Sequence, residues 1–308
     1  MKEEAVQFGE AGSLIGIVAT SPEANAKNSA VILLNPGIVH RVGPGRIYVT
    51  IARALAARGF AVLRFDFSGI GDSAVRLDNC PFEKSSVDET CAAMSFLQTT
   101  RGINRFILLG GCSGAAVSLE TARSDRRVIG AILINYPARA DEEEQTSSSS
   151  DGHYYWHFAV LSLKSWRKFL TGQSDYPKIG RALAHGLRRK FIDRGRVLEQ
   201  DQRFRTMLRE LVDRGAHLTF VCSKGDPLVG DLREAGGNDL KQLCAQSKVA
   251  CEVISRSDHT FSSLEDQERL VEAILKRVNA AAMVLERQTP EIASSSVRGL
   301  FQEPRSAS

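Results

Sequence analysis

The sequence has no apolar run that approaches the ~18 residues needed for a membrane-spanning helix. Its first eight residues are charged and have no apolar centre, so they do not resemble a signal peptide. We therefore expect a protein without membrane insertion and with a cytoplasmic location.

Closely spaced cysteine motifs are also missing. The six cysteines include no C-x-x-C pair and no histidine at the spacing typical of a zinc site. The chain also lacks a Gly-x-Gly-x-x-Gly segment and a phosphate loop with Lys followed by Ser or Thr. We expect reduced thiols and neither a metal nor an organic cofactor. The cysteines are Cys80, Cys91, Cys112, Cys222, Cys244 and Cys251.

Charge of one sign is not in large excess. The net charge of +4 is modest, and it gives no argument for a nucleic-acid partner. The 43% hydrophobic and 25% charged residues are ordinary for a globular protein. A chain of 308 residues can form one large α/β domain, or such a domain with an inserted cap. The oligomeric state is left open.

Apolar runs and helical segments alternate along most of the chain after a leading hairpin. This alternation predicts an α/β fold with a mostly parallel central sheet and helices on both faces. The expected strands are 5–9, 13–19, 30–34, 61–65, 106–109, 128–134, 217–222 and 249–254, and the expected helices are 47–58, 87–99, 115–122, 198–214, 239–246 and 264–285.

The alternation is interrupted after Asn135. A polar, low-complexity stretch at 141–150 precedes an aromatic and basic segment at 152–196 that has a helical pattern. We expect a helical cap insertion with a polar linker at 139–197, and its cations form either a solvated face or a surface that attracts an anionic substrate. The α/β core would then comprise 1–138 and 198–285, and the polar tail at 286–308 is expected to be disordered.

The rest of the chain is organised around 105–119, which contains the segment Gly-Gly-Cys-Ser-Gly-Ala at 110–115. A buried strand, an abrupt glycine turn and a small-residue helix follow one another there, as in a nucleophile elbow. Such a turn strains one residue and brings backbones close together, so its neighbours must be small. The strained residue lies at a helix N-terminus, which favours negative charge.

Two residues can serve as the nucleophile of this elbow. Centred on Cys112, the pattern has glycine at both tight positions, Gly110 and Gly114. Centred on Ser113, it has only Ala115 after the turn. The first register is preferred, and Ser113 is the alternative nucleophile. A third interpretation also stays open, in which Cys112 is a buried small hydrophobe in a glycine-rich turn.

A thiol or hydroxyl is a weak nucleophile without a base and an orienting acid. Reacting groups of open parallel sheets collect at the carboxyl ends of the strands. Asp226 follows the strand at 217–222 and His259 follows the last strand, so both are expected near Cys112. Asp231 is the second choice for the acid, since Asp226 before Pro227 is also an ordinary turn residue.

The order of nucleophile, acid and histidine resembles that of α/β hydrolases. The segments that carry the resemblance are the elbow, Gly-Ile-Gly-Asp-Ser at 69–73, Gly-Asp at 225–226 and Asp-His at 258–259. The resemblance implies the α/β-hydrolase fold, with Cys in place of Ser as in dienelactone hydrolases. The sequence at 35–44 and 63–73 further resembles that of the serine-aminopeptidase-like bacterial hydrolases, including those found with exosortase and exopolysaccharide genes.

The chemistry then assigns a role to each side chain. His259 takes the proton of Cys112, and Asp226 holds the imidazole tautomer. The backbone N–H groups of Ser113 and Ile38 are the expected oxyanion hole. This predicts hydrolysis of a small-molecule acyl substrate, and an ester or thioester is preferred over an amide. A Ser113-based esterase or peptidase, an acyltransferase and a non-catalytic scaffold are the alternatives.

The other histidines are given no catalytic role. His40 and Arg41 either point into the site or hold their own loop by hydrogen bonds. Structural or exposed positions are expected for His153, His157, His185 and His217.

Overall fold

The computed structural model describes residues 1–22, 28–139 and 194–288. Its centre is a sheet of eight strands in the order β1-β2-β4-β3-β5-β6-β7-β8. The leading hairpin of β1 and β2 is antiparallel, and the strands from β4 to β8 in this order run parallel. The strands are β1 (Lys2–Phe8), β2 (Leu14–Thr20), β3 (Ala30–Leu34), β4 (Ala61–Phe65), β5 (Phe106–Gly111), β6 (Val128–Ile134), β7 (His217–Ser223) and β8 (Val249–Ile254).

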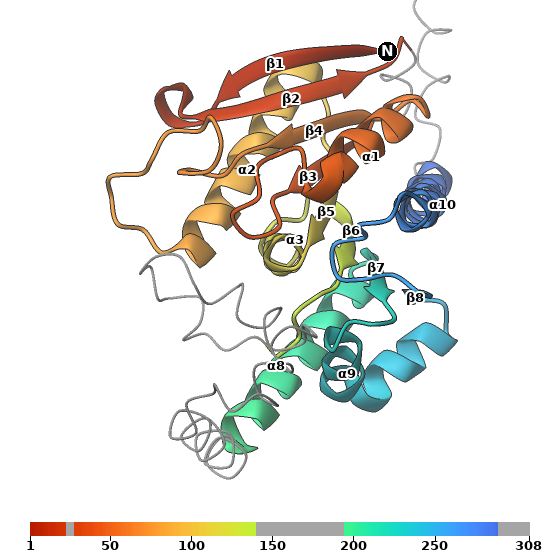
Figure 1. The fold of residues 1–308 in the computed structure, drawn as a ribbon. Helices are drawn as coiled ribbons and strands as arrows, with labels where there is room; N and C mark the ends of the chain where they lie inside the picture. Colours follow the sequence, from red (N-terminus) through yellow and green to blue (C-terminus); the bar gives the residue numbers. More distant parts are fainter. Residues whose placement is uncertain (23–27, 140–193, 289–308) are drawn as a thin grey trace, which may run out of the picture.

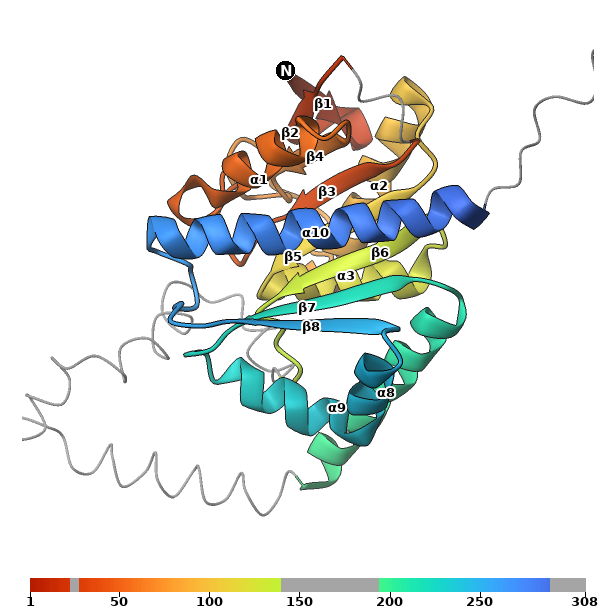
Figure 2. The same cartoon turned by 90° about the vertical axis from the view of Figure 1, so that its right-hand side faces the viewer.

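Helices cover both faces of this sheet (Figures 1 and 2). One face is covered by α1 (Ile47–Ala56) and α10 (Leu264–Gln288). The opposite face is covered by α2 (Phe82–Arg101), α3 (Ser113–Ser124), α8 (Arg194–Asp213) and α9 (Leu228–Ala245). The expected α/β fold with a mostly parallel sheet is therefore confirmed.

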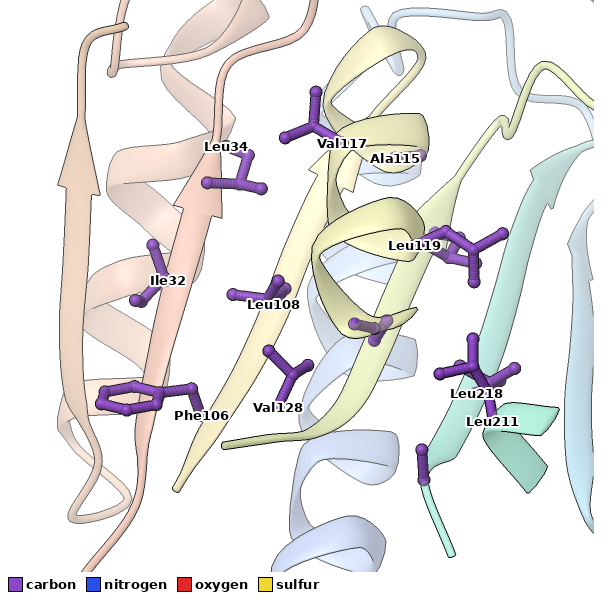
Figure 3. Close-up of a cluster of buried hydrophobic side chains, with 14 of the residues drawn as sticks. Ile32, Leu34, Phe106, Leu108, Ala115, Val117, Leu119, Val128, Leu211 and Leu218 are labelled. Carbon is purple, nitrogen blue, oxygen red and sulfur yellow. The ribbon is translucent and has the colours of Figure 1, made fainter. Parts of the chain in front are cut away.

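The central strands are continuous apolar runs because both of their faces are buried. All five residues of β3 and all five of β4 are buried. Their side chains divide between two hydrophobic clusters, one on each side of the sheet. Figure 3 shows one of them, in which Leu108 of β5 lies among side chains from neighbouring strands and from α3. Burial on this scale fixes the strand register and so fixes where each strand ends.

Two helices are longer than their patterns indicated. Helix α2 was expected at 87–99, but it begins directly after Pro81 and ends before Gly102, whose φ of 68° closes it in the left-handed region. Helix α9 was expected only at 239–246. Its first half was missed because it is rich in glycine, and Gly237 interrupts the helix with φ 53° and ψ −138°.

The expected cap at 139–197 lies almost entirely outside the described residues. Only its two ends are described, namely Arg139 and the start of α8 at residues 194–197. Most of the expected tail at 286–308 is also outside them, while α10 continues to Gln288. Within the described ranges, no helix is both long enough and apolar enough to cross a bilayer.

Candidate active site

Cys112 lies at the sharp turn between β5 and α3. Its backbone has φ 51° and ψ −118°, a conformation that is strained for a residue with a side chain. Its neighbours Gly111 and Ser113 are the last residue of β5 and the first residue of α3. Cys112 is 8% exposed. The strained position of the elbow therefore belongs to Cys112 and not to Ser113.

Both flanking glycines are required by close backbone contacts. A Cβ atom on Gly110 would lie 2.1 Å from the carbonyl oxygen of Gly114. A Cβ on Gly114 would lie 2.6 Å from the carbonyl oxygens of Leu34 and Asn35. These approaches are far below van der Waals contact, so α3 can cross the ends of β5 and β3 only with glycine at both positions.

Tyr48 ties the elbow to the neighbouring strand. Its hydroxyl donates to the carbonyl oxygen of Leu34 at 3.0 Å and accepts a hydrogen bond from Gly111 N–H at 3.0 Å. The ring is buried, and burial raises the pKa of the Tyr48 hydroxyl, so it stays a neutral donor. Sequence reasoning missed this residue, because a Tyr in the first turn of an amphipathic helix carries no signal of a long-range contact.

The His259 imidazole bonds to both of its expected partners. Its Nδ1 atom hydrogen-bonds to Asp226 Oδ2, and the side chain also hydrogen-bonds to Cys112. Burial alone lowers the pKa of His259, but the hydrogen bonds to Asp226 and Cys112, together with their negative charges, outweigh it and raise the pKa to about 10. The side chains of Cys112, His259 and Asp226 therefore form one hydrogen-bonded series.

Asp226 is fixed in the turn between β7 and α9. Its Oδ1 atom accepts a hydrogen bond, at 3.0 Å, from the N–H of Leu228, and Leu228 is the first residue of α9. The side chain is therefore held at a helix N-terminus, where negative charge is favoured. Asp226 is thus the carboxylate that contacts His259, while Asp231 lies in the first turn of α9, and the pKa of Asp231 is raised chiefly by burial.

Asp258 shapes the loop that carries His259. Its carboxylate accepts hydrogen bonds from the backbone and side chains of both Thr260 and Ser262. Burial raises the pKa of the Asp258 carboxyl, but these hydrogen bonds outweigh it and lower the pKa overall. Asp258 therefore holds residues 258–262 in a turn next to His259.

The expected oxyanion loop lies against the start of α3. Gly37 N–H donates to Ser113 Oγ at 2.7 Å, and Val39 N–H donates to the Pro36 carbonyl at 3.2 Å. Between them, Ile38 N–H donates to no group in the described ranges, and the Ile38 side chain is 83% exposed. The hydroxyl of Ser113 is therefore already bound to this loop.

A network of buried charged and polar side chains fixes the loop that contains Ile38. The carboxylate of Asp66 is fully buried and accepts hydrogen bonds from the backbone and guanidinium of Arg41. The Asn35 amide donates to Asp66 at 3.4 Å and to the Val39 carbonyl at 2.7 Å. Arg41 therefore has the loop-holding role that was one of its two interpretations.

Of the remaining histidines, only His40 and His217 lie within the described residues. His40 is exposed, and His217 begins β7, where burial lowers the pKa of its imidazole. His153, His157 and His185 fall outside the described residues. Among residues 1–22, 28–139 and 194–288, no group of three or more His, Cys, Asp or Glu side chains is placed to hold a metal ion.

A parallel sheet with a strained elbow after β5, an acid after β7 and a histidine after β8 defines the class of α/β-fold hydrolases. The family model described as "Alpha/beta hydrolase family" matches residues 31–273, and the chain belongs to this family.

Curated and solved relatives are distant. Esterase EstD of Thermotoga maritima is 27% identical over 128 residues, which cover 40% of this chain and only 31% of that protein. A Pyrococcus furiosus esterase superposes with a TM-score of 0.58 at 14% identity, with 91% of each chain covered. The thioesterase domain of the curacin biosynthetic pathway superposes with a TM-score of 0.55 at 16% identity, covering 89% of this chain and all 100% of that one. Identities this low establish the shared fold alone.

Proposed function

We propose that this hydrolase cleaves a carboxylic ester or thioester through a covalent acyl group on Cys112. The observation that carries the proposal is the hydrogen-bonded chain from Cys112 through His259 to Asp226. Three distant segments contribute to it, and a strained backbone holds the sulfur at a helix N-terminus. This arrangement has the parts that nucleophilic acyl transfer needs.

In the first half of the reaction, the Cys112 thiolate attacks the carbonyl carbon of the substrate. The developing oxyanion accepts hydrogen bonds from the N–H groups of Ser113 and Ile38, and loss of one such donor typically raises the barrier by ~3 kcal/mol. As the tetrahedral intermediate collapses, the proton on His259 Nε2 passes to the leaving alcohol or thiol. An acyl-enzyme thioester and a neutral imidazole remain.

In the second half, His259 accepts a proton from a water molecule that attacks the acyl carbon. The new tetrahedral intermediate releases the carboxylic acid and restores the thiolate–imidazolium pair. Asp226 keeps Nδ1 protonated throughout, so that Nε2 always faces the reacting atoms. Every proton therefore moves through one nitrogen of His259.

An ester or thioester substrate is preferred over an amide. A thiolate is itself a good leaving group, so an amine must be protonated to compete with its expulsion from the tetrahedral intermediate. The relatives named as an esterase and a thioesterase domain support the same choice.

Ser113 is the alternative nucleophile. Its hydroxyl accepts from the Gly37 amide, which reduces the nucleophilicity of the oxygen, whereas His259 bonds to Cys112. These contacts favour a thiol mechanism in which Ser113 holds the oxyanion loop in place. Such a mechanism requires a reduced thiol. Because thiols stay reduced in the cytoplasm, we propose a cytoplasmic location as well. We also propose that the chain belongs to the serine-aminopeptidase-like branch, because its residues at 35–44 and 63–73 resemble those of that branch.

The test compares Cys112→Ala and Ser113→Ala on a panel of p-nitrophenyl esters and acyl thioesters. Loss of the nucleophile typically costs at least about 10³-fold in turnover, so Cys112→Ala is expected to abolish activity. Ser113→Ala removes one hydrogen bond and should cost about tenfold or less. The reverse ranking would assign the chemistry to Ser113. Turnover only with an added acceptor would indicate an acyltransferase, and no turnover of any substrate would indicate a scaffold.

A further inference from the structure

Asn135 lies at the carboxyl end of β6, between the strand ends that carry the proposed nucleophile and acid. It is 2% exposed, and its backbone has φ 46°, in the left-handed region that asparagine tolerates better than most side chains. A buried polar residue in this conformation requires an explanation, because a burial site normally selects an apolar side chain.

The side-chain amide of Asn135 bridges two loops. Its Oδ1 atom accepts hydrogen bonds from the N–H of Ser223 at 2.8 Å and from the Ser223 hydroxyl at 3.0 Å. Its Nδ2 atom donates to the backbone carbonyl of His259 at 2.9 Å. One planar group therefore joins the end of β7 to the residue that carries the imidazole.

The backbone around Asn135 extends these connections to the other two members of the proposed triad. The carbonyl of Ile134 accepts from the N–H of Cys112 at 2.9 Å. The carbonyl of Ser223, in turn, accepts from the N–H of Asp226 at 3.1 Å. The dipeptide Ile134–Asn135 is thus linked, directly or through Ser223, to all three residues.

We propose that Asn135 is a positioning residue that sets the spacing of Cys112, His259 and Asp226. The inference rests on the proposed function, since it concerns the same three side chains. Asn135 touches no reacting atom and acts through the backbone of His259. An amide holds both of its partners in fixed directions, and a buried hydrogen-bond network of this kind favours a single arrangement. A shift of about 1 Å in a catalytic group can cost about 10²-fold in rate.

The first variant is Asn135→Gly, because glycine keeps the left-handed backbone while it removes the side chain and, with it, the amide. We expect kcat to fall about 10- to 100-fold while KM changes by less than about threefold, since the residue does not face the substrate. The basic limb of the pH profile of kcat/KM should also move to lower pH, because a displaced His259 loses part of the contact with Asp226 and Cys112 that raises its pKa.

A second variant, Ser223→Ala, removes one of the two hydrogen bonds to Oδ1 and leaves the backbone unchanged. It should move kcat and the pH profile in the same direction by a smaller amount, which keeps the test informative if Asn135→Gly does not fold. The matched control is Asn79→Gly, which makes the same change at an exposed left-handed asparagine outside the site. It should match wild type in rate and in pH profile.

Folding is checked by circular dichroism and thermal melting. The reactivity of Cys112 is followed separately, as the iodoacetamide alkylation rate of its own peptide by mass spectrometry across pH. The positioning role predicts a shifted alkylation profile in a folded Asn135→Gly protein. The inference is overturned if folded Asn135→Gly and Ser223→Ala keep the wild-type kcat and both profiles. Failure of the proposed function is distinguishable, because wild-type activity would then survive complete alkylation of Cys112.

Discussion

Adding one methyl group at Gly114 should separate the elbow from the oxyanion loop. The Cβ of Gly114→Ala would lie 2.6 Å from the carbonyl oxygens of Leu34 and Asn35, which are backbone atoms at the end of β3. Ordinary contact begins at 3.4 Å, so a displacement of roughly 0.8 Å is needed. The Leu34 carbonyl cannot yield easily, because the buried Tyr48 hydroxyl donates to it.

The strain should lower both the free energy of unfolding and the rate of the reaction. Overpacking of this kind costs about 1–3 kcal/mol of unfolding free energy. The displacement falls between Cys112 and the amide of Ile38, and a misplacement of about 1 Å costs about 10²-fold in rate. Gly114→Ala should therefore lose about 10²-fold in kcat/KM while remaining largely folded at 25 °C.

The assay is ester hydrolysis measured alongside urea unfolding. The matched control is Gly230→Ala in α9, where a new Cβ has no atom within 4 Å and should leave activity unchanged and add about 0.5–1 kcal/mol to the unfolding free energy. Wild-type activity and stability in Gly114→Ala would refute the close crossing of α3 over β3.

Three further outcomes are expected. The pKa of His259 is raised from 6.5 to about 10, so its protonation stabilises the fold fully below pH 6.5. This contribution to the free energy of unfolding is lost as pH rises through about 10. It is measured by urea unfolding of wild type and His259→Gln across pH 6 to 10.5. Tyr48→Phe leaves the buried Leu34 carbonyl and the partly buried Gly111 N–H without their hydroxyl partner and should cost about 1–3 kcal/mol of stability, together with a fall in kcat. Arg41→Ala leaves the buried Asp66 carboxylate without its cation and should cost about 3–5 kcal/mol in urea unfolding.

Each of these has a contrary result. Parallel pH dependences for wild type and His259→Gln would mean that the histidine is not stabilised in its charged form. Unchanged stability and kcat in Tyr48→Phe would show that water replaces the hydroxyl. For Arg41 the control is Arg123→Ala, whose exposed pair with Glu120 should be worth less than about 1 kcal/mol, and an equal cost for the two variants would contradict the buried network.

Local patterns predicted the strands and the elbow well. The strand at 128–134 was predicted with its observed bounds, because a buried parallel strand is a continuous apolar run. The glycine spacing around Cys112 identified the strained residue, since only that register has glycine at both close contacts. The contact between His259 and Asp226 was expected because side chains at the carboxyl ends of neighbouring parallel strands lie close together.

The supporting residues could not be found in this way. Tyr48 and Asn135 make contacts across 63 and 124 residues of sequence, to Gly111 and to His259, respectively. Their roles depend on which strands become neighbours, and no local period or turn signal encodes that. Asn135 ended the expected strand without any indication of a function, although a polar residue directly after a buried run is a signal worth testing.

The most direct test of the account is to locate the acyl group in the trapped intermediate. Wild-type protein is quenched with acid during turnover of a p-nitrophenyl ester, digested, and its elbow peptide is sequenced by tandem mass spectrometry, with neutral hydroxylamine used to distinguish a thioester from an ester. The thiol mechanism predicts an acyl group on Cys112 that hydroxylamine removes. A stable acyl ester on Ser113 would contradict it.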